Sequence, residues 1–217
     1  MPLNPDYIDV GIAFWGKRGW AADFHNSFYV GEVPKLRPID GRFDSDWWDR
    51  IWPALRAWSA TRRGGSRAQM TQRAEQEFPD LERLWREEVS AHLGDDIVTV
   101  PWDEVAEFTA HVSCIKGVWS PVFTSKLCHF LIPQVFPVVD NWAMGNPYST
   151  YGEYYQAAQA MWRETDADTR VLLVAKLRSL IGPEMDPSFP MVCKLVELHL
   201  IGKHHWPRSG IEVAARS

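Results

Sequence analysis

The first residue to consider for chemistry is Lys126, which lies on the apolar side of a predicted helix over residues 120–132. At about 100° per residue, Lys126 falls between Val122 and Phe130 on the helical wheel, inside the apolar arc. Removing an ammonium group from water disfavours its charged form. Either the lysine stem therefore runs along the arc until its head reaches water or a carboxylate, or Lys126 is an amine nucleophile kept partly neutral by burial.

A carboxylate follows at Asp140, after the apolar stretch Phe136–Val139 and at a predicted helix start. An aspartate in that position accepts hydrogen bonds from backbone amides, and those bonds and the helix dipole keep it ionised. Capping alone explains such a residue. Beside Lys126, however, the same carboxylate completes an amine and carboxylate pair that is suited to covalent catalysis.

Two motifs resemble the helix-hairpin-helix DNA glycosylases: Ser125–Pro133 (SKLCHFLIP) and Phe136–Asp140 (FPVVD). They are similar to the lysine-bearing second helix of the hairpin and to the V-P-V-D step after it, as found in the 8-oxoguanine DNA glycosylase branch. The resemblance covers residues 114–145. It implies that Lys126 attacks the sugar, that Asp140 assists, and that a damaged or modified base is excised, in repair or in attack on foreign DNA. It also implies that a Schiff base forms between Lys126 and the sugar, from which the strand can be nicked. If Lys126 is too distant from the sugar, Asp140 would instead orient a water, and the enzyme would only remove the base.

Contacts with DNA are expected at the start of the lysine-bearing helix. Ser120 followed by Pro121 is a strong helix start, and its backbone amides suit a phosphate, so we expect contacts around Ser120, Thr124 and Ser125. A basic flank is expected from the loop before this region, for which a solvated loop is the alternative interpretation. The residues of this flank are Arg62, Arg63 and Arg67.

Twelve tryptophans are present, and most should fill the core because tryptophan buries a large apolar area. Trp119, directly before Ser120, and Trp142, just after Asp140, are the best placed to stack on an extruded base. These two residues are our candidates for the base pocket.

The elements that must position these residues are predicted to be helices. Residues 1–44 are rich in glycine, proline and aromatics, which predicts loops and short turns. Beyond them, apolar residues recur at three- and four-residue steps, with no alternation typical of strands. The expected helices begin at Ser45, capped by Ser45 or Asp46, and then span 66–78, 79–93, 102–115, 120–132, 151–162, 167–181 and 190–201. The apolar face of the 167–181 helix is predicted to be Val171, Leu172, Val174, Ala175, Leu177 and Leu180.

The predicted fold is therefore all-α, a compact multi-helix glycosylase-like domain over residues 1–217 with a helix-hairpin-helix-like element. A chain of 217 residues suits one domain, or two helical lobes with the active site between them. No stretch is long and apolar enough for a membrane helix, and the N-terminus lacks a signal peptide, so we expect a cytoplasmic monomer. The three cysteines lack metal or iron-sulfur spacing, so no cofactor is expected.

The net charge of −5 leaves DNA binding open, because a basic face is sufficient for it. P-loop, G-x-G-x-x-G, H-E-x-x-H and G-x-S-x-G motifs are missing, which leaves nucleotide, zinc and serine hydrolysis unsupported. Two alternatives to a glycosylase stay open. One is a non-catalytic all-α nucleic-acid-binding module, in which Lys126 contacts a phosphate and Asp140 only caps. The other is a helical domain whose aromatic pocket binds a small molecule or a protein.

Overall fold

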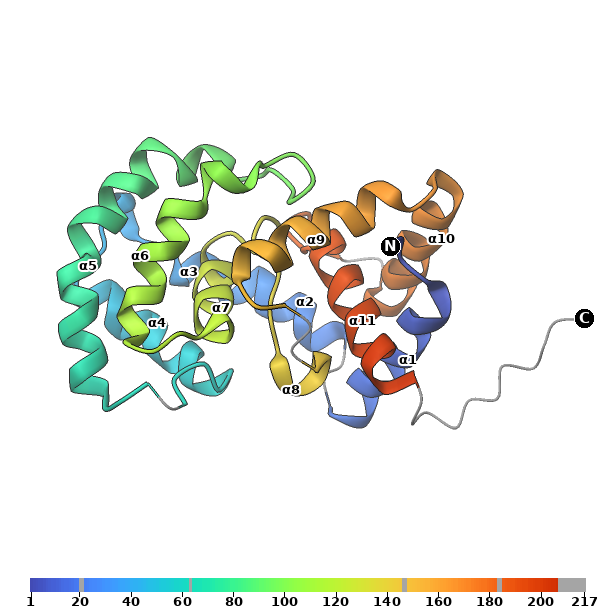
Figure 1. The fold of residues 1–217 in the computed structure, drawn as a ribbon, viewed down its shortest axis with the longest axis horizontal. Helices are drawn as coiled ribbons and strands as arrows, with labels where there is room; N and C mark the ends of the chain where they lie inside the picture. Colours follow the sequence, from blue (N-terminus) through green and yellow to red (C-terminus); the bar gives the residue numbers. More distant parts are fainter. Residues whose placement is uncertain (20–21, 63, 146–147, 183–184, 207–217) are drawn as a thin grey trace, which may run out of the picture.

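The computed structural model describes residues 1–19, 22–62, 64–145, 148–182 and 185–206. Every regular element in these ranges is helical, which confirms the all-α prediction (Figure 1). The α-helices are α1 (Pro5–Lys17), α2 (Ala22–Gly31), α3 (Val33–Leu36), α4 (Ser45–Ala57), α5 (Arg67–Glu87), α6 (Ala106–Lys116), α7 (Pro121–Leu131), α8 (Asn141–Met144), α9 (Tyr151–Glu164), α10 (Ala167–Ile181) and α11 (Met191–His205). Short 3₁₀ turns lie at Ile39–Gly41, Val89–His92 and Trp102–Glu104.

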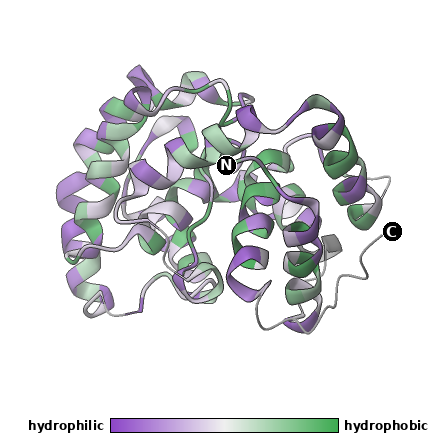
Figure 2. Ribbon diagram, turned by 45° about the vertical axis from the view of Figure 1, so that its right-hand side comes forward, coloured by the Kyte–Doolittle hydropathy of each residue, from purple (hydrophilic) through white to green (hydrophobic). Residues whose placement is uncertain are grey.

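The helices form two groups with the candidate site residues between them. Figure 1 shows α4, α5 and α6 at one end of the molecule and α1, α10 and α11 at the other, with α7 and α8 in the middle. Hydrophobic and hydrophilic residues alternate along most of these helices, as expected of amphipathic elements (Figure 2). None of the described helices is long and apolar enough to cross a membrane.

The prediction of loops over residues 1–44 is wrong, because α1, α2 and α3 occupy much of this region. Asn4 caps α1 by accepting a hydrogen bond from the Asp6 amide, and Pro5 takes the first helical turn. One glycine of this region, Gly11, serves helix packing instead of a turn. A Cβ on Gly11 would lie 2.2 Å from the Leu198 carbonyl oxygen, so only glycine lets α1 approach α11 this closely.

Two predicted helix boundaries also need correction. The cap of α4 is Asp44, whose side chain accepts from the Trp47 amide, instead of Ser45 or Asp46. Residues 66–93 were expected to form two helices broken at Pro79, but α5 continues through this proline to Glu87. Its buried positions run on across Pro79 in one stripe, so packing outweighs the lost backbone hydrogen bond. The buried positions are Met70, Ala74, Phe78, Leu81, Leu84 and Trp85.

The bounds of α10 match the prediction, but its predicted apolar face is mostly wrong. Val171 is 70% exposed and Leu172 is 57% exposed, whereas Leu173, Leu177 and Ile181 are buried. The helix carries apolar residues around much of its circumference, so the pattern cannot select a face. The neighbouring helices determine which stripe is covered.

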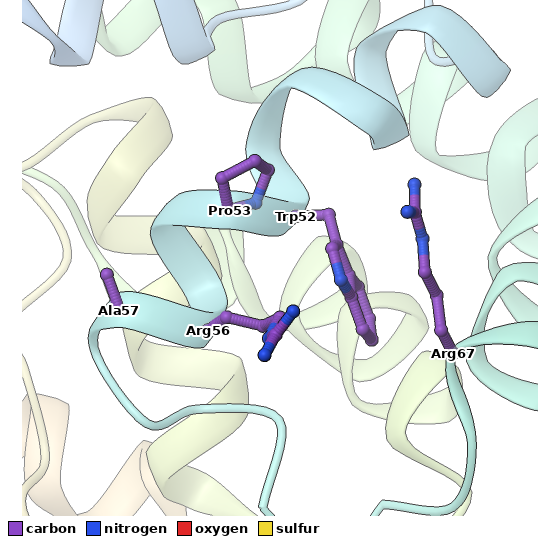
Figure 3. A pocket seen from close by; sticks show the side chains of 5 residues that line it. All are labelled: Trp52, Pro53, Arg56, Ala57 and Arg67. Carbon is purple, nitrogen blue, oxygen red and sulfur yellow. The ribbon is translucent and has the colours of Figure 1, made fainter.

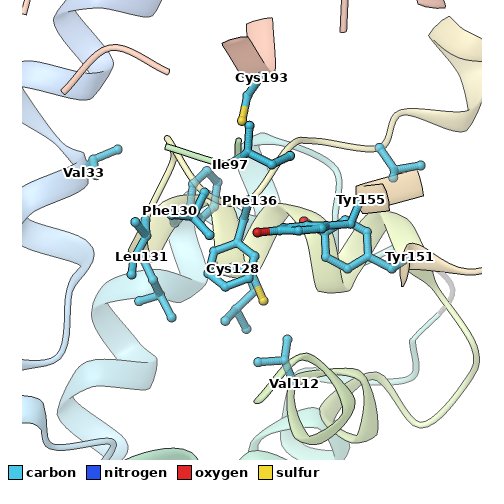
Figure 4. Packing of buried hydrophobic residues seen from close by; sticks show 14 of the residues in the cluster. Val33, Ile97, Val112, Cys128, Phe130, Leu131, Phe136, Tyr151, Tyr155 and Cys193 are labelled. Atoms are coloured by element: carbon cyan, nitrogen blue, oxygen red, sulfur yellow. The ribbon is translucent and has the colours of Figure 1, made fainter. Parts of the chain in front are cut away.

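Helices α7 and α11 are the most completely buried elements. Every residue of α7 except Val122 is buried, and so is each residue of α11 from Val192 to Gly202. Figure 4 shows this packing, with Cys128 of α7 and Phe136 lying among tyrosines of α9 and close to Cys193 of α11. A charged side chain on either helix must therefore find a partner within the protein.

Candidate active site

The link between α6 and α7 leads directly into the site. Gly117 ends α6 in the left-handed conformation, at φ +70°, and Ser120 then caps α7 by accepting from the Phe123 amide. Between them, Val118 and Trp119 are exposed to solvent. This helix, short link and helix lie where the sequence predicts a helix-hairpin-helix-like element. That the two helices are the family's hairpin stays a prediction.

Lys126 lies in the buried part of α7 and is only 5% exposed. Its Nζ donates hydrogen bonds to the carbonyl oxygen of Trp58 at 2.8 Å and to Asp140 Oδ2 at 3.2 Å. The sequence prediction that these two side chains meet or share a cleft agrees with this distance. The head of the lysine therefore reaches a carboxylate inside the protein and not bulk water.

Asp140 divides its two oxygens between capping and pairing. Oδ1 accepts from the backbone amides of Trp142 and Ala143 at the start of α8, while Oδ2 accepts from Lys126. Capping fixes the rotation of the carboxylate group, so Oδ2 is held toward the amine. The two interpretations of this residue drawn from the sequence are therefore compatible.

The segment that delivers Asp140 is held in place from two sides. Each residue from 136 to 139 has one backbone group bonded to a buried side chain of α7 or α9. The four contacts are His129 Nδ1 with the Phe136 oxygen (2.6 Å), Tyr151 Oη with the Pro137 oxygen (3.1 Å), Tyr154 Oη with the Val138 oxygen (2.9 Å) and the Val139 amide with Ser125 Oγ (3.0 Å). This anchoring fixes the position of the carboxylate relative to Lys126.

Both residues of the pair line one cleft of about 890 Å³, a volume typical of a ligand site. Trp119 and Trp142 line it too and are 63% and 57% exposed. The guanidinium of Arg18 lies 4.1 Å from the centre of the Trp142 ring, which sequence reasoning did not anticipate. The cleft therefore combines aromatic faces, an amine and a carboxylate. Further residues that line the cleft include Trp58, Arg62, Lys116, Lys194 and Glu197.

The structure does not favour two of the residues predicted to contact DNA at the start of α7. Thr124 and Ser125 are buried, and their hydroxyls donate to the Ser120 and Val122 carbonyl oxygens. The prediction relied on backbone amides, but those of Thr124 and Ser125 lie beyond the first turn of α7, where the Thr124 amide donates to the Ser120 carbonyl oxygen, so both residues are corrected to structural roles. Ser125 instead positions the segment before Asp140. Ser120 lines the cleft and keeps its predicted place.

The predicted basic flank is split. Arg62 is exposed and lines the cleft, whereas Arg63 lies outside the described residues. Arg67 forms an ion pair with Asp49 and lines a separate pocket, in which the Trp52 ring lies between the Arg56 and Arg67 side chains (Figure 3). Of the two arginines that the structure describes, Arg62 lies at the candidate site and Arg67 does not.

Sequence reasoning missed a set of backbone carbonyl oxygens between α4 and α5, and of the residues that carry them Trp58, Ala60 and Arg62 line the cleft. The carbonyl oxygens of alternate residues accept from cations: Trp58 from Lys126, Ala60 and Arg62 from Lys116, and Gly64 from Arg73. Burial, together with the nearby Arg73, lowers the pKa of Lys116 to about 8. No sequence pattern marks carbonyl acceptors, so this arrangement could not have been anticipated.

Three lysines therefore line the cleft, and their partners distinguish them. Lys116 is 1% exposed and its amine bonds only to carbonyl oxygens. Lys194 is also 1% exposed and pairs with Glu197 on its own helix. Lys126 is the most accessible of the three, and its carboxylate partner stands on a separate, capped element. By its accessibility and its partner, Lys126 is thus the lysine best placed to contact a ligand in the cleft.

No protein-family model, curated protein or solved structure matched this chain. Within the described residues, no three histidine, cysteine, aspartate or glutamate side chains gather as metal ligands. What the cleft can do follows from its own geometry.

Proposed function

We propose that the protein is a DNA glycosylase that receives an extruded damaged or modified base in the cleft and removes it, with Lys126 as nucleophile and Asp140 as its partner. The observation that carries the proposal is the 3.2 Å contact between the buried amine and the capped carboxylate. Because a base inside a stacked duplex is inaccessible, such an enzyme needs a pocket for an extruded nucleotide. The proposed partner is DNA, bound by a cytoplasmic monomer.

The proposed chemistry begins with transfer of a proton from the Lys126 ammonium to Asp140 Oδ2. The amine lone pair then attacks C1′ of the deoxyribose, and the bond from C1′ to the base breaks with its electrons leaving on the base, which takes up the proton held by Asp140. Opening of the sugar gives a Schiff base between Lys126 and C1′. Loss of a proton from C2′ and departure of the 3′ phosphate then nick the strand.

The surrounding groups have defined tasks in this scheme. The Trp58 carbonyl oxygen, 2.8 Å from Nζ, retains an N–H of the amine and so orients its lone pair. Asp140 accepts the ammonium proton and passes it to the leaving base, and the carboxylate so restored stabilises positive charge on the sugar. Trp119 and Trp142 offer faces for a base to stack on. Arg18, Arg62 and Ser120 are the proposed phosphate contacts.

Release of free base tests this proposal. Duplex oligonucleotides carrying one oxidised, alkylated, deaminated or methylated base each are incubated with the protein, and released bases are identified by mass spectrometry. Wild type should release at least one base that Lys126→Gln does not. Release of none would contradict the proposal and favour the non-catalytic binding module. Equal release by both proteins would assign the reaction to a water oriented by Asp140, and Lys126 would not be the nucleophile.

A further inference from the structure

A second charged pair, Lys194 and Glu197 of α11, lines the same cleft. Lys194 Nζ lies 2.5 Å from Glu197 Oε2, and the two residues are only 1% and 7% exposed. Burying two charges is unfavourable unless both are paired and hydrogen-bonded. A pair at this depth therefore calls for a reason beyond stability.

The surroundings of Lys194 are aromatic. Its ammonium lies 5.7, 5.9 and 5.8 Å from the ring centres of Trp15, Tyr29 and Trp58, distances at which the rings attract a cation. The ammonium is thus held by three rings and one carboxylate oxygen. Glu197 in turn raises the pKa of Tyr29, adding to the larger effect of burial.

Within the described protein, Glu197 uses only one of its two carboxylate oxygens, and the residue lines the cleft. Oε2 accepts from Lys194, but among the described residues Oε1 has no hydrogen-bond partner, although the side chain is more than nine-tenths buried. A carboxylate oxygen is only an acceptor, so an unpartnered one in a cleft selects a ligand that offers an N–H or O–H. Because Lys194 neutralises the pair, Glu197 does not repel a phosphate backbone.

Trp58 connects this pair to the candidate catalytic pair. Its carbonyl oxygen accepts from Lys126, and its ring lies against the Lys194 ammonium. A ligand held by Glu197 therefore lies in the cleft into which Lys126 points. Glu197 is thus placed to hold a ligand, and Lys126 is placed to react with it.

We propose that Glu197 recognises the extruded base, with Oε1 accepting an N–H from an exocyclic amino group on the edge of that base. Lys194 is a positioning residue that holds the carboxylate in its orientation through the bond to Oε2. This inference rests on the proposed function, since it names the substrate class of the same site. It predicts a preference for bases with an amino group on the edge over counterparts in which a carbonyl replaces it, because a carbonyl facing Glu197 leaves both acceptors unpaired.

The test separates recognition of the base from reaction with the sugar. Excision is measured on duplexes that carry either an amino-bearing base or the base in which a carbonyl replaces that amino group, namely 5-methylcytosine or thymine, adenine or hypoxanthine, and 2,6-diaminopurine or guanine. Borohydride trapping is measured on a duplex with a preformed abasic site, which has no base to recognise. Glu197→Gln should lower excision of the preferred base by about 10- to 100-fold, the value of a hydrogen bond to a charged group. It should also shift the amino-to-oxo ratio toward oxo, since glutamine can donate, and leave trapping within about twofold.

Glu197→Gln leaves Lys194 without its partner, so Lys194→Met/Glu197→Gln is the second variant. Methionine fits the aromatic surroundings without a charge. Loss of excision with intact trapping in either folded variant supports the proposal. Excision and trapping that fall by the same factor, or an unchanged amino-to-oxo ratio, would overturn it while leaving the glycosylase proposal standing. If wild type neither excises nor traps, the proposed function and this inference fall together.

Discussion

The two lysine and carboxylate pairs of the cleft differ in construction. Lys126 and Asp140 come from different elements, α7 and the cap of α8, and the aspartate side chain is 26% exposed. Lys194 and Glu197 stand three residues apart on one helix, and their side chains are 1% and 9% exposed. The first pair is assembled by the fold and open to the cleft, whereas the second is local and nearly sealed.

The two constructions suit a lysine and carboxylate pair to different tasks, reaction and recognition. A pair that must react needs an accessible amine and a carboxylate whose second oxygen is fixed elsewhere, as the cap of α8 provides for Asp140. A pair that must recognise needs one unpartnered oxygen in a rigid frame, as the aromatic rings around Lys194 provide.

The largest effect is expected at Asp140. Asparagine caps nearly as well as aspartate, so Asp140→Asn should retain α8. It removes the proton acceptor and the negative charge, so excision should fall by about 100- to 10 000-fold, as for loss of general acid–base catalysis. Single-turnover kinetics and thermal unfolding, measured together, check this. Full activity in the variant would reduce Asp140 to a cap.

The second effect is on stability and is measured by double-mutant cycles. Removing either partner of the sealed pair should lower the free energy of unfolding by about 3–5 kcal/mol, because the other charge is left buried. Lys194→Met/Glu197→Gln should recover most of this loss. The equivalent cycle on Lys126→Met and Asp140→Asn should give a smaller coupling, because Asp140 is partly solvated. Equal couplings would remove the distinction between the two pairs.

A third effect comes from His199, another buried titratable group of α11. Burial lowers the pKa of His199 to about 4, with further lowering by Lys203 and the chain N-terminus, and its Nδ1 accepts from the Asn4 amide. The unfolded chain binds this proton below about pH 6.5 but the folded chain does not until about pH 4. Stability should therefore decline as pH falls through this window, by at most about 3 kcal/mol.

Denaturant titrations at pH 7 and pH 4.5 measure that decline. His199→Asn keeps an acceptor near Nδ1 and cannot titrate there, so it is the matched control. An identical pH dependence in both proteins would assign the acid sensitivity to other groups.

The smallest effect is expected at the cleft edge. Arg62→Ala and Arg18→Ala should each weaken binding to a duplex about equally for all sequences and lower the slope of log affinity against log salt by about 1. Arg67→Ala is the control, because Arg67 is paired with Asp49 and lines a different pocket. A larger change for Arg67→Ala than for Arg62→Ala would relocate the interface.

The sequence predicted the local part of this structure well. The Ser120 cap, the α10 bounds and the helix start at Asp140 depend on residues close in the chain, so their patterns are readable. The wheel position of Lys126 also indicated a buried amine that needs a partner. Local rules failed where distant packing decides, as at Gly11 of α1, whose glycine permits contact with α11 instead of a turn.

The second pair could not be predicted, because an i, i+3 lysine and glutamate usually mark a solvated helix face. Only the full burial of α11 turns Lys194 and Glu197 inward. The same limitation hid the Trp58 carbonyl oxygen, since a backbone acceptor has no signature in the sequence. Sites built from such groups can be recognised only once the fold is known.

The most direct test of the central claim is borohydride trapping on a duplex with one abasic site, followed by mass spectrometric mapping of the adduct. The wild-type adduct should map to Lys126. Lys126→Arg, which keeps the cation next to Asp140 but cannot form a Schiff base, should give none, and Lys116→Gln should still give it. An adduct that maps to Lys116 or Lys194, or that persists in Lys126→Arg, would contradict the assignment of Lys126 as the nucleophile.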